Sequence, residues 1–123
     1  ARVFGIPKDL SGSVDLPLIC DWPNRPKQMV DFERGKAACT HWEKISEDVN
    51  INTSLIKLKP ITGRSHQLRV HMMSLGHPIL GDRLYAHEKA KSLSSRLCLH
   101  AEHIQFTHPL SGELLSFNSP FDF

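Results

Sequence analysis

The hydrophobic period of the chain changes near residue 60, from alternation typical of strands to spacing typical of a helix. Ser54–Lys59 alternates apolar with polar or charged residues, and Pro60 ends that pattern. Beyond Ser65, apolar residues recur at spacings of four and three, which places them on one face of a helix. The residues that set this spacing are Leu68, Met72 and Leu75.

Capping signals place the limits of this helix at about residues 65–75. Ser65 suits the N-cap position, Gly76 suits the position just after the last turn, and Pro78 prevents continuation. This is the principal helix, and residues 88–93 predict a short second one. The remaining patterned segments predict strands at residues 1–5, 14–19, 38–45, 54–59, 103–108 and 113–117.

Short connections join most of these strands. Glu47–Asn50 predicts a hairpin connection, Pro109–Gly112 predicts another, and the two prolines of Asp21–Pro26 predict an irregular loop. Strands paired through short connections, with one principal helix, predict an α+β domain built on a mainly antiparallel sheet.

Size and composition predict one domain over residues 1–123, with Trp22 and Trp42 contributing to a modest core. No run of about 18 apolar residues indicates a membrane span. Three cysteines, distant from one another, argue against a disulfide framework and favour a reducing, cytoplasmic setting. The net charge is only +2, but the window Lys57–Arg83 holds five basic residues and one acidic residue, a balance of +4.

That positive window contains Gly63–His71, in which Arg64 and Arg69 lie five residues apart beside His66 and Gln67. A guanidinium matches two oxygens at once, so the pair predicts an oxyanion site for phosphate or carboxylate. The start of the helix adds exposed N–H groups and a favourable dipole. Ordinary solvated arginines are the alternative.

Other kinds of site find little support in the spacing. His66 and His71 lie about 140° apart on a helix, and no cysteine or carboxylate completes a zinc ligand set. Neighbouring Ser65 and His66 do not face each other on a helix, so no nucleophilic triad is expected. Asp82, the one carboxylate in the positive window, is predicted to be a turn residue that caps nearby N–H groups, with a functional carboxylate as the alternative.

Three motifs in order resemble the RluA family of pseudouridine synthases, and the segment Val14–Gln28 extends the resemblance to nearly the whole chain. The motifs are Leu58–His71, Gly76–Tyr85 and Leu97–Ala101. The resemblance implies isomerisation of uridine to pseudouridine in RNA, with no metal and no organic cofactor, by an aspartate nucleophile. That aspartate belongs to an Arg-Leu-Asp motif, which this sequence lacks because Tyr85 follows Arg83-Leu84 and Cys98 follows Arg96-Leu97. We therefore expect residues 1–123 to be the C-terminal portion of a catalytic domain and to be inactive alone.

The family resemblance also implies roles for individual residues. Arg69 would pair with the absent aspartate and keep it ionised, Leu99 would pack near the flipped uracil, and Arg64 would bind RNA or serve the scaffold. Flipping a nucleotide costs a few kcal/mol, which contacts to RNA phosphates would offset. The candidate phosphate contacts are Lys57, Lys59, Arg83, Arg25 and Lys27.

The substrates implied by the resemblance are a uridine in the tRNA anticodon loop and one in 23S rRNA of the large subunit. A non-catalytic RNA-binding module is the alternative function.

Overall fold

The computed structural model describes residues 1–100, 103–107 and 114–118. Its main sheet has four antiparallel strands in the order β1-β6-β5-β2. Two further antiparallel pairs are β3-β4 and β7-β8. The strands are β1 (Arg2–Phe4), β2 (Ser11–Asp15), β3 (Leu18–Cys20), β4 (Gln28–Val30), β5 (Cys39–Asp48), β6 (Thr53–Pro60), β7 (His103–Thr107) and β8 (Leu114–Asn118).

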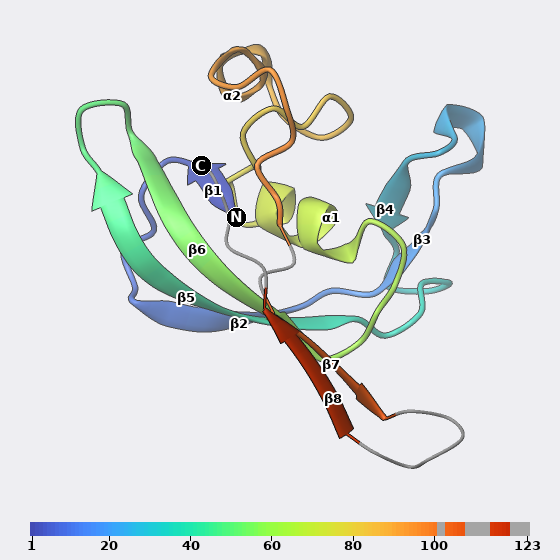
Figure 1. The fold of residues 1–123 in the computed structure, drawn as a ribbon. Helices are drawn as coiled ribbons and strands as arrows, with labels where there is room; N and C mark the ends of the chain where they lie inside the picture. Colours follow the sequence, from blue (N-terminus) through green and yellow to red (C-terminus); the bar gives the residue numbers. More distant parts are fainter. Residues whose placement is uncertain (101–102, 108–113, 119–123) are drawn as a thin grey trace.

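The main sheet curves around the principal helix α1 (Gln67–Ser74), and the β3-β4 pair lies beside the same helix (Figure 1). A 3₁₀ turn, η1 (Trp22–Asn24), lies between β3 and β4, and the short helix α2 (Glu88–Ser92) follows α1. This arrangement confirms the predicted α+β class, with mainly antiparallel strands and one principal helix. Within the described residues, no helix has the length and apolar content needed to cross a membrane.

Two strand predictions need correction. The segment 14–19 is not one strand: β2 ends at Asp15 and β3 starts at Leu18, because Pro17 between them has no N–H to donate to a ladder. Strand β5 is longer than predicted and includes Glu47 and Asp48, so the turn of the β5-β6 hairpin falls at residues 49–52. The predicted connection at 109–112 lies outside the described residues.

Helix α1 begins two residues later than predicted. Its N-cap is His66, in a left-handed conformation with φ 53°, and not Ser65. In the described part of the chain, no side chain caps the start of α1. The Gln67 side chain instead holds the preceding loop: its Oε1 accepts from Thr62 Oγ1 at 2.6 Å and from the Arg64 N–H at 3.0 Å. At the other end Gly76 has φ 87° and follows the last turn as predicted.

The buried face of α1 also differs from the apolar stripe read in the sequence. Met72 is buried, but Leu75 is 38% exposed, and the buried residues include the polar Gln67 and His71. His71 Nδ1 lies 2.8 Å from Thr40 Oγ1, and its Nε2 lies 2.9 Å from the Leu16 carbonyl oxygen. A polar side chain can be buried when its hydrogen bonds are made, so α1 packs on the sheet through polar contacts as well as apolar ones.

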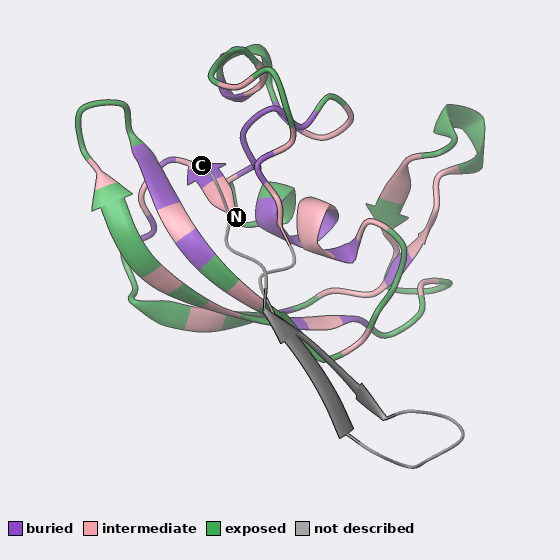
Figure 2. Ribbon diagram, in the orientation of Figure 1, coloured by how far each residue is buried: buried purple, intermediate pink, exposed green. Residues whose placement is uncertain are grey.

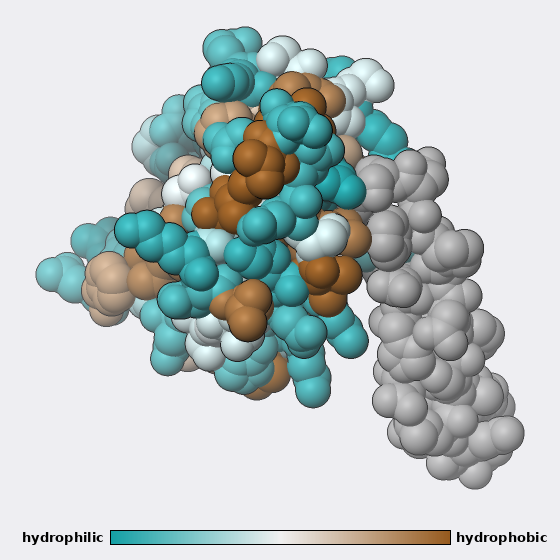
Figure 3. Space-filling model, turned by 90° about the vertical axis from the view of Figure 1, so that its left-hand side faces the viewer, coloured by the Kyte–Doolittle hydropathy of each residue, from teal (hydrophilic) through white to brown (hydrophobic). Residues whose placement is uncertain are grey.

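The core lies between the main sheet, α1 and the segment that follows α1, where Figure 2 shows the buried residues gathered. Hydrophobic patches among hydrophilic atoms also reach the surface on the face that Figure 3 shows. Trp42 packs against the core as predicted, whereas the prediction for Trp22 is wrong, because its side chain is 62% exposed on η1. The main core residues include Val3, Ile56, Met72, Ile79 and Leu80.

Candidate functional site

The predicted site residue Arg69 is held by a carboxylate of this chain. Its Nε donates to Asp82 Oδ2 at 3.0 Å, and its Nη2 donates to Asp82 Oδ1 at 2.7 Å. The Asp82 side chain is fully buried, and that of Arg69 is 18% exposed. Two parallel bonds of this kind fix the plane of the guanidinium. Within the described residues, Nη1 makes no hydrogen bond, so it is available to another acceptor.

Asp82 also performs the turn role predicted from the sequence. Its Oδ1 accepts from the N–H groups of Leu84 and Tyr85, at 3.0 and 3.2 Å. Burial raises the pKa of this carboxyl, but the hydrogen bonds from Arg69 and Leu84 outweigh burial, and its pKa falls below the ordinary value. Asp82 therefore stays ionised, and its hydrogen bond raises the pKa of Arg69.

Tyr85 and His66 extend this pair toward the surface. The Arg69 guanidinium carbon lies 5.2 Å from the centre of the Tyr85 ring, and the Tyr85 hydroxyl lies 2.6 Å from His66 Nδ1. The same hydroxyl oxygen accepts from the Gln28 N–H at 2.8 Å. We name Arg69, Asp82, Tyr85 and His66 the arginine cluster.

Burial and the neighbouring Arg69 lower the pKa of His66, which makes its imidazole neutral at pH 7. Burial raises the pKa of Tyr85, so the phenol keeps its proton. We assign that proton to the bond with His66 Nδ1, which leaves the imidazole hydrogen on Nε2. His66 then offers a neutral donor where Arg69 offers a charged one.

The side chains of His66 and Arg69 line a pocket of about 410 Å³. We name it the base pocket after the uracil that the sequence resemblance predicts beside Leu99. Arg64, Leu97 and Leu99 also line it. The structure thus brings together three residues predicted for the site, Arg64, Arg69 and Leu99, from segments up to 35 positions apart. A pocket of this volume, mostly apolar with a few polar groups, is of the kind that binds small molecules.

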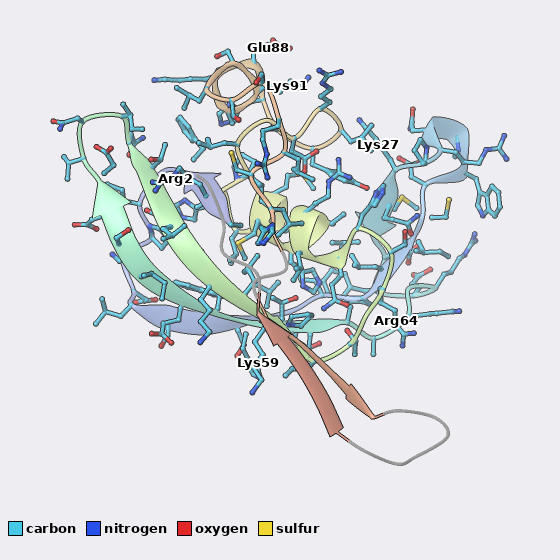
Figure 4. The ribbon with its side chains drawn as sticks, in the orientation of Figure 1. Arg2, Lys27, Lys59, Arg64, Glu88 and Lys91 are labelled. Carbon is cyan, nitrogen blue, oxygen red and sulfur yellow. The ribbon has the colours of Figure 1, made fainter. Side chains whose placement is uncertain are left out.

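Arg64 is held less tightly than Arg69. It is exposed, and its Nε donates to the Ala37 carbonyl oxygen at 3.0 Å. The loop that carries it is anchored by Gln67, whose Nε2 donates to the Cys39 carbonyl oxygen at 2.9 Å. Figure 4 shows Arg64 beside the segment that joins β4 to β5. The backbone is therefore fixed while the end of the side chain stays accessible.

The other predicted phosphate contacts lie away from the base pocket. Lys57 and Lys59 are exposed on the outer face of β6, and Figure 4 shows Lys59 on the side away from α1. Figure 4 also shows Lys27, near β4, well separated from Arg64. Arg25 lies over the Trp22 ring at 5.2 Å, and Arg83 is exposed beside Asp82.

Sequence reasoning missed the ion pair of Asp82 and the contacts of Tyr85. Asp82 stood out as the lone carboxylate of the positive window, but its partner lies thirteen positions away and only the fold shows it. Nothing marked Tyr85 as a site residue. Within the described residues, no three His, Cys, Asp or Glu side chains gather into a metal ligand set.

Comparisons with known proteins identify similar sequences and similar folds. Residues 1–74 match a family described as RNA pseudouridylate synthase. Dual-specificity RNA pseudouridine synthase RluA of Escherichia coli K12 is 58% identical over 123 residues, which cover all of this chain and 56% of that protein. The protein of the same name from Haemophilus influenzae Rd is 54% identical over the same coverage. The chain thus spans about half the length of these curated relatives.

Two solved structures share the fold. Human RNA pseudouridylate synthase domain containing 1 superposes with a TM-score of 0.82 at 25% identity, covering 98% of this chain and 52% of that one. Human RNA pseudouridylate synthase domain containing 4 gives 0.71 at 25% identity, with 99% and 56% covered. The sequence match covers more than half of the chain and the fold match nearly all of it, so this chain belongs to the RNA pseudouridylate synthase family.

Proposed function

We propose that the whole protein is an RNA pseudouridine synthase, an isomerase that converts uridine to pseudouridine within RNA. The observation that carries this proposal is the geometry of Arg69: Asp82 holds Nε and Nη2, and Nη1 remains for a second carboxylate at the edge of the base pocket. In the proposal that carboxylate is the nucleophile aspartate of the family, supplied from outside these 123 residues. Residues 1–123 would then be the C-terminal portion of one catalytic domain.

A guanidinium beside the nucleophile has two effects. It lowers the pKa of the aspartate by about 1–3 units, which keeps the nucleophile ionised at neutral pH. It also restricts the rotamer of that aspartate, provided that the guanidinium is itself fixed. The bidentate contact with Asp82 supplies this fixation and makes Asp82 a positioning residue for Arg69.

The walls of the base pocket suit a flipped uracil. Leu97 and Leu99 offer apolar surface, and His66 Nε2 offers one donor that a uracil carbonyl can accept. We propose that Leu99 packs against the base and that Arg64 contacts an RNA phosphate. Lys57, Lys59, Arg83, Arg25 and Lys27 remain candidates for weaker phosphate contacts.

We further propose the substrates that the sequence resemblance implies, a uridine in a tRNA anticodon loop and one in 23S rRNA. The protein would act in the cytoplasm, in keeping with its three free thiols, Cys20, Cys39 and Cys98.

Pseudouridine formation by the whole protein tests the proposal. The substrate would be a 17-nucleotide RNA anticodon stem-loop, and the product would be measured by nucleoside chromatography with mass spectrometry. We expect Arg69→Met to lose at least about a hundredfold in kcat, because it removes a preorganised charge at the nucleophile. Lys8→Met, an exposed cation away from the pocket, is the matched control and should retain kcat. Pseudouridine formation by Arg69→Met at the rate of the parent protein would contradict the proposal. RNA binding without any product from the parent would instead favour a non-catalytic RNA-binding module.

A further inference from the structure

A second pocket, of about 470 Å³, adjoins the base pocket. Three cationic side chains line it, those of Arg34, Lys36 and Arg64, together with the exposed indole of Trp22. Among the described residues, no acidic side chain lines it. We name this pocket, defined by these four residues, the cationic groove.

The backbone holds the first two cations in place. Asp31 Oδ1 accepts from the N–H groups of Glu33 and Arg34, at 2.9 and 3.0 Å, and closes a tight turn. Lys36 then pairs with Leu18 of β3 through two backbone hydrogen bonds of 2.8 and 2.9 Å. The turn therefore fixes where these two side chains leave the backbone.

Arg64 reaches the groove from the loop before α1. Its Nε donates to the Ala37 carbonyl oxygen. Its two terminal nitrogens make no hydrogen bond within the described residues. Arg34, Lys36 and Arg64 also have no ion-pair partner among those residues. The backbone N–H and the charge of Arg34 both lower the pKa of the Asp31 carboxyl, so this nearby carboxylate offsets part of the positive charge. Lys36 and Arg64 add two further positive charges on the lining of the pocket, and a net positive lining favours binding of an anion.

Trp22 makes the groove suitable for nucleic acid in particular. Its side chain is 62% exposed, which is unusual for so large an apolar ring. The Arg25 guanidinium lies 5.2 Å from the ring centre and helps to hold it in place. An aromatic ring beside a cationic track is the arrangement by which proteins hold single-stranded nucleic acid, with bases stacked on the ring and phosphates on the cations.

The groove and the base pocket are neighbours, because Gly63 and Arg64 line both. A strand whose uridine occupies the base pocket can pass its flanking phosphate over Arg64 into the groove. We propose that the cationic groove binds the single-stranded RNA next to the target uridine, with phosphates on Arg34 and Lys36 and one unpaired base stacked on Trp22. This inference rests on the proposed function, which supplies the neighbouring uridine.

The first test separates binding from chemistry in the whole protein. The double variant Arg34→Ala/Lys36→Ala would be compared with Lys8→Ala/Lys89→Ala, which removes the same charge from exposed sites outside the groove. The probe is the 17-nucleotide stem-loop, and the readouts are its Kd across salt concentrations and the kcat at saturating RNA.

We expect the groove variant to bind at least tenfold more weakly than the control, with an unchanged kcat. The slope of log K against log salt should become less negative by about 1.4, since each phosphate contact to a single strand contributes about −0.7. An unchanged Kd and salt slope would overturn the proposal that the groove binds RNA. The proposed function would remain intact if Arg69→Met still abolishes product.

The second test concerns the stacked base. Trp22→Ala should weaken binding about tenfold, and Trp22→Phe should restore most of the loss. Stem-loops with an abasic nucleotide at each loop position in turn should reveal one position where Trp22→Ala causes no further loss. Equal losses at every position would contradict stacking.

Two further outcomes concern the ligand of the groove. A seven-residue polyglutamate peptide that binds as tightly as the stem-loop would show an acidic-peptide site instead. No RNA binding by the parent would also overturn the proposal. RNA binding that depends on the groove, without any pseudouridine formed, would contradict the proposed function and would leave the proposal for the groove intact.

Discussion

The arginine cluster and the cationic groove contain the same kinds of side chain under different constraints. In the cluster, Arg69 is mostly buried and bound at two points by Asp82. In the groove, Arg34 and Lys36 are exposed and have no ion-pair partner among the described residues. A fixed charge suits the positioning of a reacting group, whereas accessible charges suit a salt-sensitive attraction for phosphate. We infer that the cluster serves chemistry and the groove serves binding.

The largest effect on stability should come from Asp82. Asp82→Ala leaves the Arg69 guanidinium mostly buried without a counter-charge and removes two turn hydrogen bonds, so we expect a loss of about 3 kcal/mol in the free energy of unfolding. Urea unfolding followed by circular dichroism measures it. Asp9→Ala, at an exposed site, is the control and should change stability by about 0.5 kcal/mol or less. Equal losses in the two variants would show that the pair is not a structural anchor.

Gly35→Ala tests whether the groove depends on its backbone. A Cβ at Gly35 would collide with the Asp31 carbonyl oxygen and the Pro17 backbone, so the turn must shift, at about 1–3 kcal/mol. Thermal unfolding should reveal the loss, and RNA affinity should fall although no charge is removed. Gly63→Ala is the control for stability, because its Cβ would meet no atom within 4 Å. If Gly35→Ala unfolds at the same temperature as the parent protein, the turn is more flexible than we infer.

The pH dependence of stability tests the environment of His66. Its folded pKa is lowered below the ordinary value of about 6.5, so the unfolded chain binds a proton more readily. Stability should therefore fall as the pH drops through 6.5 towards the folded pKa. His66→Asn, which tolerates the left-handed backbone, should show a smaller fall between pH 7.5 and 5.5 in urea unfolding. Identical pH profiles would place His66 in an ordinary aqueous environment.

The smallest effect should come from the outer face of β6. Lys57→Ala/Lys59→Ala removes two charges from the side away from α1. We expect the affinity for the RNA stem-loop to fall about threefold or less, because only weak phosphate contacts or long-range attraction are lost. The same titrations that test the groove measure it. A loss as large as that of Arg34→Ala/Lys36→Ala would show that the outer face binds RNA as strongly as the groove does, which would contradict the separate role inferred for the groove.

The sequence predicted the features that depend on local pattern. The β5-β6 hairpin, the cap at Gly76 and the short helix α2 follow from alternation, turn residues and helical spacing. The start of α1 was not predicted correctly, because the Gln67 side chain holds the preceding loop through contacts with Thr62 and Arg64. No local pattern reports that Gln67 is buried against β5.

The site was predicted in part for the same reason. Arg64 and Arg69 stood out by their spacing, but the partner of Arg69 in this chain depends on how the segment after α1 folds back. The groove was missed because its cations come from two loops far apart in sequence, and because Trp22 was assigned to the core. Contacts of long sequence separation give no periodic signal.

One pair of variants tests the central distinction most directly. Arg69→Met and Arg64→Met each remove one guanidinium from the wall of the base pocket, and kcat and Kd for the RNA stem-loop would be measured for both in the whole protein. We predict that Arg69→Met loses kcat by about a hundredfold or more with a small change in Kd, and that Arg64→Met loses affinity and keeps kcat at saturating RNA. Similar effects of the two substitutions on both quantities would contradict the separation of chemistry from binding.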